Sequence, residues 1–232
     1  MGQADAIDKT AIRDAATVIV LRDRKDNPRV LMGQRGAKAA FMPNKFVFPG
    51  GAVDQGDGFI PLAAPLNTLC QGRLQEDCST DISHALAAAA IRELWEETGL
   101  ILGQRGEWTD LPPEDWTSFA QAGFVPDASS LQFVFRAITP PGRPRRFDAR
   151  FFLIDADQLS SDLDDFSRAS EELSHLQWVP ISQARNFDLP FITEVVLSEI
   201  SARLTETGPL SSVPFFRNDD EESLFLRLRG AG

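Results

Sequence analysis

The chain has 232 residues and is 43% hydrophobic, which is enough for the core of one large domain and too apolar for a disordered chain. Its 23 basic and 34 acidic residues give a formal net charge of −11, which argues against a nucleic-acid backbone or an anionic membrane surface as the main partner. An anionic substrate stays compatible with this charge, because bound cations can reverse the local sign.

Three further features favour a cytoplasmic protein. No run of 18 apolar residues occurs in the sequence, so we expect no membrane-spanning helix. The first 14 residues are polar and of mixed charge, which is not typical of a signal peptide. Cys70 and Cys78 are the only cysteines, and so small a number favours a reducing compartment, with a local disulfide between them as the alternative.

Strand patterns dominate the first part of the chain. Residues 16–23 form a β-branched apolar run that predicts a buried strand. Residues 28–35 follow after a polar turn, so we expect the two segments to pair as a hairpin. Residues 45–51 predict a short aromatic strand that Pro49 and two glycines interrupt, and residues 54–81 are expected to be a long irregular loop or insertion.

An alanine-rich stretch, residues 79–99, predicts a helix. Ser, Thr or Asp at 79–81 can cap its start. Apolar residues at a spacing of four, from Ile82 to Leu94, give the helix a stripe that faces the core. Gly99 suits the left-handed position at the helix end.

The rest of the chain alternates short strands and helices. A proline starts the first of these helices, and Thr193 or a neighbour is expected to cap the last one. A Pro-rich turn at 140–144 joins two of the strands. Strands are expected at 130–139, 146–156, 175–181 and, as a final edge strand, 223–229, and helices at 110–123, 182–187 and 190–204.

Three glutamates crowd the end of the expected 79–99 helix. At 100° per residue, Glu93, Glu96 and Glu97 fall within an arc of about 100°. Like charges at this spacing repel, and Arg92 alone cannot neutralise three acids. A solvated acidic face is one interpretation, but it leaves the crowding unexplained. A hard divalent cation, which takes several oxygen ligands, explains it and is the interpretation that we favour.

The segment Arg92–Leu100, RELWEETGL, resembles the helix half of the Nudix box, whose pattern is R-E-U-x-E-E-x-G-U with U apolar. Upstream, FPGGAVDQGD resembles the loop half of the box, which is a glycine, five residues and then a glutamate. Counted from Gly51, the glutamate position is occupied by Asp57. The family places seven residues between the halves, whereas residues 58–91 supply 34 here. Such interrupted boxes are similar to those of a Nudix subgroup that includes coenzyme A diphosphatases, and the long insertion leaves the role of Asp57 open.

The resemblance implies an α/β (α+β) fold, a Nudix-type α/β/α sandwich with a mixed central sheet. It implies a single domain over residues 1–232, with a core at about 16–204, an insertion at about 58–81 and a C-terminal extension at 205–232. We hypothesise that the insertion covers one wall of the substrate cleft and sets selectivity. The alternative is an excursion that packs on the domain for stability.

The implied activity is metal-dependent hydrolysis of a diphosphate (P–O–P) bond in a nucleoside diphosphate linked to another moiety, coenzyme A-like or ADP-ribose-like. The cofactor would be Mg²⁺ or Mn²⁺ and the partner a small molecule, not nucleic acid or a membrane. A Nudix-fold binding module that senses a nucleotide without cutting it is the alternative, although such a module is expected to have lost box glutamates. A homodimer is compatible with the sequence.

The resemblance and the oxygen chemistry of hard cations together indicate the central residues. Glu96 and Glu97 are expected metal ligands, and the carbonyl of Gly51 is a further oxygen ligand. Glu93 is expected to be a ligand or the general base. Arg92 is included among the catalytic residues because it is expected to form an ion pair that orients one glutamate, and not because it is expected to bind substrate.

Substrate contacts and additional acids are expected around the glycine turn. Gly50 lets the backbone approach a phosphate group. Arg35 and Lys45 flank the turn and are candidates to contact phosphate, with exposed surface cations as the alternative. Three further acids, Asp57, Glu171 and Glu172, are candidates for an extra ligand or for the base. For Glu171 and Glu172 the alternative is that they are solvated loop acids.

Overall fold

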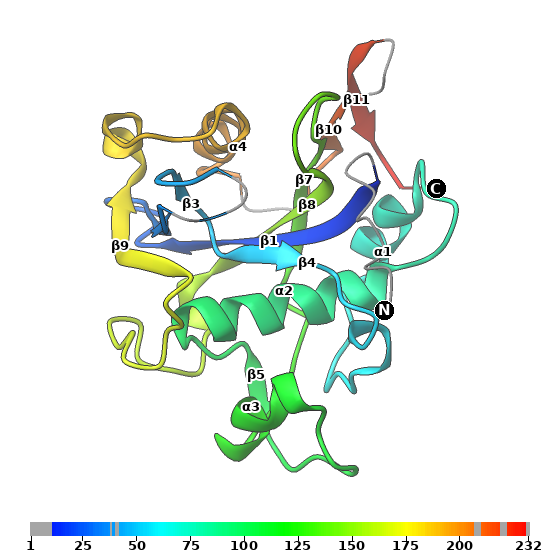
Figure 1. Ribbon diagram of the computed structural model, residues 1–232, viewed down its shortest axis with the longest axis vertical. Coiled ribbons are helices and arrows are strands. Elements are labelled where there is room, and N and C mark those ends of the chain that lie inside the picture. The colour runs from blue at the N-terminus through cyan, green and yellow to red at the C-terminus, as the bar shows by residue number, and fades with distance from the viewer. Residues whose placement is uncertain (1–10, 38, 40–41, 207–209, 219–221, 231–232) are drawn as a thin grey trace, which may run out of the picture.

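A mixed nine-stranded sheet forms the middle of the molecule in the computed structural model, which describes residues 11–37, 39, 42–206, 210–218 and 222–230 (Figure 1). The strands are β1 (Ile12–Arg22), β2 (Arg29–Arg35), β3 (Phe46–Val47), β4 (Gly50–Ala52), β5 (Gly103–Arg105), β6 (Phe124–Pro126), β7 (Gln132–Ile138), β8 (Arg146–Asp155), β9 (Leu173–Pro180), β10 (Val213–Asn218) and β11 (Ser223–Leu228). The helices are α1 (Thr68–Gln75), α2 (Ser83–Thr98), α3 (Thr117–Gln121) and α4 (Phe191–Ala202), with short 3-10 helices η1 (Asp57–Phe59), η2 (Glu114–Trp116), η3 (Ala156–Gln158) and η4 (Ile181–Asn186).

The central strand β1 changes partners along one of its edges. The order of the sheet is β11-β10-β7-β8-β1-β2-β3, and β4 and β9 add to β1 and β2. On one edge, β1 runs parallel to β8 over almost its full length. On the other edge, residues 15–17 pair with β4 and residues 21–22 pair with β2, both antiparallel. The glycines of β4 therefore lie against the first half of the central strand.

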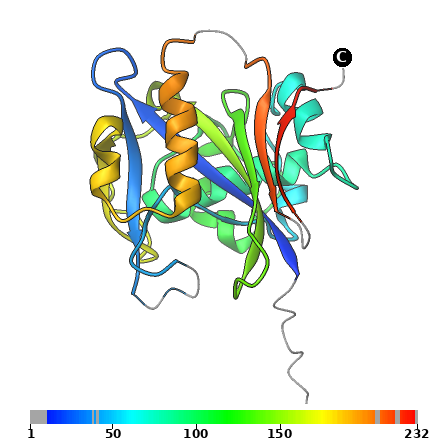
Figure 2. The ribbon, with the colours of Figure 1, turned by 90° about the horizontal axis from the view of Figure 1, so that it is seen from above.

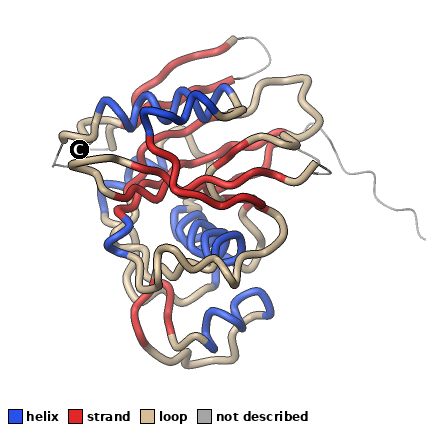
Figure 3. The backbone as a smooth tube through the Cα atoms, turned by 90° about the vertical axis from the view of Figure 1, so that its left-hand side faces the viewer, coloured by secondary structure: helices blue, strands red, loops and turns tan. Residues whose placement is uncertain are grey.

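Side-chain alternation along β1 separates two cores. Val18 and Val20 face the core that contains α2, whereas Ile19 and Leu21 face the core that contains α4. Figures 2 and 3 show α4 over one face of the sheet and α2 over the other, with the β5–β6 ribbon and α3 beyond α2. The expected α/β/α sandwich with a mixed sheet is thus confirmed.

Most strands lie where the sequence predicted them. The expected hairpin of residues 16–35 forms as the antiparallel pair β1–β2, and the two strands joined by the 140–144 turn pair antiparallel as β7–β8. The final edge strand expected at 223–229 is confirmed as β11. Strand β10 was not expected, because Pro214 lies at its second position and proline is depleted in strands. Since β10 pairs with β7, the described residues after 205 extend the central sheet rather than form a separate appendage.

The helix ends correct two expectations. Helix α2 begins at Ser83, later than expected, and Asp81 accepts the Ser83 N–H at 2.9 Å from just outside the helix. Its end is as expected, with Gly99 at φ +74°. Helix α4 has no side-chain cap, because its N-cap residue is Pro190, which has no side-chain acceptor, and Thr193 lies inside the helix. Among the described residues, no helix is long and apolar enough to cross a bilayer.

The insertion, residues 58–81, is more regular than the expected loop, because it contains helix α1. Asn67 starts this helix by accepting the N–H of Cys70 at 2.9 Å. Leu66 and Leu74 are each 3% exposed and belong to the core that contains α2. The expectation of an irregular segment is therefore wrong over α1, whose apolar side was hidden by the turn-forming residues around it.

We predict that the insertion stabilises the fold through this buried side. Leu74→Ala should lower the free energy of unfolding by about 2–4 kcal/mol, since it leaves a cavity in the core. Phe59→Ala is the matched control in the same segment, because Phe59 is 86% exposed, and it should change stability by less than about 0.5 kcal/mol. Urea denaturation measures both values. Equal effects would contradict the assignment.

Candidate active site

Two glutamates of α2 are buried against the glycine turn of β4. Glu97 is 1% exposed and Glu93 is 8% exposed, whereas Glu96 is half-buried. The N–H of Gly50 donates to Oε2 of Glu97 at 2.7 Å. The carboxylate of Glu93 lies against Gly51. The helix thus presents its acids to backbone groups of the turn rather than to open solvent.

Both glycines of the turn are required by close packing. A Cβ atom on Gly51 would lie 2.6 Å from Cδ of Glu93, which is far inside contact distance. A Cβ atom on Gly50 would lie 2.5 Å from the carbonyl oxygen of Ala16 on β1. Only residues without a side chain let the helix, the turn and the central strand approach this closely.

Arg92 connects the acids of this region. Its Nε and Nη2 donate to the two carboxylate oxygens of Asp57, each at 3.0 Å. Its Nη1 donates to Glu93 at 2.9 Å and to Glu96 at 3.3 Å, and Nη2 also donates to the carbonyl of Ala52 at 3.0 Å. Arg92 is 4% exposed. This geometry is that of a positioning residue that holds two glutamates and the loop after β4 in place.

Asp57 serves this ion pair. It is 2% exposed, both its carboxylate oxygens accept from Arg92, and one of them also accepts the N–H of Asp54 at 2.8 Å. The contact lies on the loop immediately before the insertion, so Asp57 keeps its place next to α2 despite the long sequence gap. Its oxygens are occupied by protein donors, which suits anchoring of Arg92 more than metal ligation.

Burial and mutual repulsion make the glutamates reluctant to ionise. Burial raises the pKa of Glu93 to about 7, although Arg92 acts in the opposite direction. Burial, followed by the charge of Glu93, raises the pKa of Glu97 well above its ordinary value. Burial also raises the pKa of Glu96. A divalent cation would reverse this balance, because it stabilises the ionised carboxylates.

One buried oxygen suits such a cation. Oε1 of Glu97 has no hydrogen-bond partner among the described residues. A buried carboxylate oxygen without a partner is costly unless an ion or water meets it. Within the same described part of the chain, no three Asp, Glu, His or Cys side chains form a ready-made metal-binding group. Glu93 and Glu97 thus meet the glycine turn from the side of α2, and the three glutamates do not converge on one point.

A cleft of about 1030 Å³ opens beside these acids. Glu93 and Glu96 contribute to its lining together with small side chains of the sheet, such as Ala15 and Ala149, and with residues 190–193 at the start of α4. The volume is at the upper end of the range for small-molecule sites. A ligand as large as a nucleotide with an attached group fits such a space.

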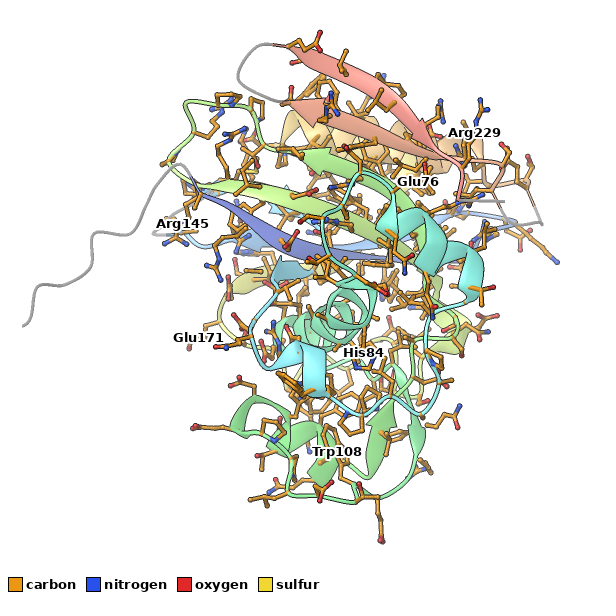
Figure 4. All side chains as sticks on the ribbon, turned by 90° about the vertical axis from the view of Figure 1, so that its right-hand side faces the viewer. Glu76, His84, Trp108, Arg145, Glu171 and Arg229 are labelled. Carbon is orange, nitrogen blue, oxygen red and sulfur yellow. The ribbon has the colours of Figure 1, made fainter. Side chains whose placement is uncertain are left out.

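The other predicted site residues surround the same cleft, but most are paired. Arg35 donates to Glu172 at 2.7 Å, and Lys45 pairs with Asp188 outside the lining. Glu171 also lines the cleft, and Figure 4 shows it on the same side of the molecule as Arg145. The charge of Glu172 contributes to the raised pKa of both Glu93 and Glu97. The loop before β9 therefore interacts electrostatically with the glutamates of α2.

The insertion does not line this cleft. None of residues 58–81, all of which the structure describes, is among the lining residues. For this cleft, the hypothesis that the segment forms one of its walls is therefore contradicted. Several of its apolar residues, Ile60 and Leu66 before α1 and Leu74 within it, belong instead to the core that contains α2.

Two contacts of the site were not expected from the sequence. Oδ2 of Asp54 lies 3.4 Å from Nη2 of Arg92, and Oδ1 of Asp54 lies 3.8 Å from Nη2 of Arg13. Asp54 stands three residues before Asp57 in an acid-bearing loop, and that spacing is a signal for it. Arg13 has no such signal, because the pairing of β1 with β4 brings it to the site.

Comparison with known proteins supports the same architecture, although no family model matches the chain. The chain is 31% identical over 179 residues to the putative nudix hydrolase 7 of Caenorhabditis elegans, which covers 72% of this chain and 51% of that protein. It is 28% identical over 180 residues to the acyl-coenzyme A diphosphatase NUDT19 of Gallus gallus, over 53% of this chain and 47% of that protein. The crystal structure of a NUDIX hydrolase from Alicyclobacillus acidocaldarius matches with a TM-score of 0.64 and 28% identity, over 86% of this chain and 99% of that one.

The fold and the site define the class, an α/β/α protein whose buried glutamates face a glycine turn beside a cleft. The chain belongs to the Nudix hydrolase family. It spans about half the length of the curated relatives that it matches.

We predict that Arg92→Ala lowers the free energy of unfolding by about 3 kcal/mol or more, because it leaves Asp57 buried without its cation. Arg24→Ala is the matched control. Arg24 pairs with Asp155 at 2.9 Å, but the two side chains are 25% and 38% exposed, so the loss should stay below about 1 kcal/mol. Chemical denaturation of both variants measures the difference. A loss as small as that of the control would show that the buried pair does not anchor the loop.

Metal-free stability should depend on pH through Glu93. The pKa of this group is raised from 4.5 to about 7, so the folded state binds its proton more tightly than the unfolded state does. The resulting stabilisation is present below about pH 4.5 and is lost as pH rises through about 7. We compare the free energy of unfolding of Glu93→Gln with that of wild type in EDTA. The difference, variant minus wild type, should be larger at pH 8 than at pH 5 by about 1 kcal/mol or more. Urea titrations at both pH values test this, and a pH-independent difference would contradict it.

Proposed function

We propose that the protein hydrolyses the diphosphate (P–O–P) bond of a nucleoside diphosphate linked to another moiety, in a reaction that depends on a divalent metal. The observation that carries the proposal is the pair of buried glutamates, Glu93 and Glu97, against Gly50 and Gly51 beside the cleft. Two buried acids with raised pKa are an unfavourable arrangement for stability alone. They are a useful arrangement where a cation has to be held next to an anionic substrate.

The metal would be Mg²⁺ or Mn²⁺, held by oxygen ligands from Glu96 and Glu97 and from the carbonyl of Gly51, with Glu93 either as a further ligand or as the general base. The unpartnered Oε1 of Glu97 supports this assignment. When bound, such a cation neutralises diphosphate oxygens and lowers the pKa of a bound water. Carboxylate and carbonyl oxygens are the ligands that these hard cations prefer.

The chain itself would position groups and take up a proton. Arg92 holds Oε1 of Glu93, so Oε2 of the same carboxylate is the atom available to accept a proton as a general base. A pKa of about 7 suits a group that exchanges protons near neutral pH. Glu171 and Glu172 lie at the cleft and are the other candidates for this role or for an extra ligand.

The substrate contacts that we propose are Arg35, Lys45 and the backbone of Gly50, because all three line the cleft. Arg35 and Lys45 would exchange their present acidic partners for phosphate oxygens. Since one relative is named an acyl-coenzyme A diphosphatase, a coenzyme A-like substrate is one candidate. An ADP-ribose-like substrate is the other, and the cleft volume suits both.

The setting that we propose is cytoplasmic, with a small-molecule substrate and no nucleic acid or membrane partner. The net charge of −11 argues against a polyanionic partner such as nucleic acid, because like charges repel. Cys70 and Cys78 are both free in the structure, in agreement with a reducing compartment. A homodimer stays part of the proposal, to be tested by the mass in solution.

Hydrolysis should require added metal. We expect phosphate-containing products from a panel of coenzyme A, ADP-ribose and other nucleoside diphosphate compounds in Mg²⁺ or Mn²⁺, and none in EDTA. The reason is that carboxylates and diphosphate repel one another without a cation. Chromatography of the nucleotide products measures the result, and re-addition of metal is the control. Full turnover in EDTA would refute the mechanism.

Glu97→Gln should abolish turnover and keep the fold. The amide is nearly isosteric and removes a buried charge, so metal-free stability should be unchanged or rise by up to about 1 kcal/mol. Metal affinity should fall at the same time. Glu107→Gln is the control, because Glu107 is exposed and does not line the cleft. Calorimetric metal titration and turnover test both variants, and near-normal turnover in Glu97→Gln would show that this acid is not a ligand.

A binding module without catalysis would give a different result in these experiments. It would bind nucleotides from the panel, with or without metal, and release no product. The three box glutamates favour the enzyme over this alternative, because a module that only binds has no need to keep buried acids with raised pKa.

A further inference from the structure

The cleft has a basic corner that neither the box motif nor the proposed ligands account for. Arg13, Arg143 and Arg145 line it, in a chain whose net charge is −11. Arg143 and Arg145 are exposed, and no ion pair or side-chain hydrogen bond joins them to any described residue. Arg13 has one long contact, 3.8 Å to Asp54. Guanidinium groups that share a cleft without partners repel one another, so the corner favours an anion.

Strand register brings these arginines together from distant parts of the sequence. Arg13 pairs in register with Phe147, the second residue of β8. Arg143 and Arg145 stand in the turn that leads into the same strand. The parallel pairing of β1 with β8 therefore places all three at one end of the cleft. This placement cannot be seen in the spacing of the residues along the chain.

The turn that carries two of the arginines is conformationally restricted. Pro140, Pro141 and Pro144 limit the backbone, and Gly142 takes φ +80°. The residue before a proline is restricted to extended conformations, which applies to Arg143. A turn that presents its cations in few conformations loses little entropy when it binds a ligand.

The basic corner lies next to the acidic wall of the cleft, which consists of Glu93 and Glu96. Asp54 is 3.8 Å from Arg13 and 3.4 Å from Arg92, and Arg92 in turn contacts Glu93 at 2.9 Å. A ligand in the cleft can therefore reach the acids and the arginines at once. The acids suit phosphate only through a cation, whereas the arginines can bind phosphate oxygens directly, often with two parallel hydrogen bonds.

We propose that Arg13, Arg143 and Arg145 form a second anion-binding subsite, in addition to Arg35, Lys45 and Gly50. It holds a phosphate group of the substrate beside the acidic wall. This inference rests on the proposed function for the substrate class, a phosphate-bearing nucleotide, and adds the residues that select for its charge. The subsite contributes to binding and to the orientation of the substrate, and takes no part in proton transfer.

Equilibrium binding without metal tests the subsite separately from hydrolysis. The probes are adenosine, AMP and ADP, measured by calorimetry in EDTA. The test variant is Arg143→Gln with Arg145→Gln. The control variant is Arg105→Gln with Arg185→Gln, which removes two exposed charges that do not line the cleft. Both variants have the same net charge, so long-range attraction is equal in the two.

We expect the test variant to bind AMP and ADP at least about 10-fold more weakly than wild type, with adenosine unchanged and the control variant close to wild type. The loss should shrink at high salt. A larger loss for ADP than for AMP places the subsite at the diphosphate, and equal losses place it at a single phosphate. Both results support the proposal.

Other results would overturn it. These are an equal loss for adenosine, an equal loss in the control variant, or no binding of AMP and ADP by wild type at millimolar concentration. Failure of the proposed function has a separate signature, since it means no turnover of any diphosphate in Mg²⁺ or Mn²⁺. That outcome leaves the binding result unchanged.

Discussion

The site depends on one buried ion pair, that between Arg92 and Asp57. Both oxygens of the acid accept from the guanidinium, so helix α2 is tied to the loop after β4 at two points. The same guanidinium orients Glu93 and Glu96. A buried pair of this kind is expensive to desolvate and adds little net stability, but it permits few alternative arrangements. Its contribution here is geometric, because it determines where the carboxylates stand relative to the glycine turn.

The same ion pair explains how the chain accommodates its long insertion. Asp57 is the last residue before residues 58–91, and it contacts the first residue after them. The two halves of the box are therefore joined through space at the point where the chain leaves and returns. The intervening segment can then form its own helix, α1, and pack into the core beside α2. Its length has little influence on the site, since loop length alone changes the closure entropy slowly.

Charge in this protein has opposite signs at different scales. The chain as a whole is acidic, yet its cleft combines an acidic wall, Glu93 and Glu96, with a basic corner, Arg13, Arg143 and Arg145. The diphosphate substrate that we propose would use both, through a cation at the acids and direct hydrogen bonds from the arginines. The glutamates are kept in an unfavourable buried state by the sandwich around them, which shows as their raised pKa. Such local strain is typical of functional sites and is supported by the stability of the rest of the fold.

The sequence by itself determined the elements with strong local signals. The apolar run of β1, the stripe of α2 and Gly99 at its end depend on neighbours within a few residues, so they could be predicted. The helix half of the box was visible for the same reason, since all of its members lie on one short segment. Helix α1 and strand β10 were missed, because turn formers and Pro214 conceal elements that tertiary pairing stabilises.

Only the tertiary structure decided which charges face one another. Spacing predicted that Glu93, Glu96 and Glu97 share a helix face, but not that Gly50 binds Glu97 or that Asp57 is taken by Arg92. It also could not place Arg13 beside the turn that carries Arg145, since the parallel pairing of β1 with β8 does this. The physical reason is that ion pairs and clefts join residues distant in sequence, and local periodicity carries no information about such contacts.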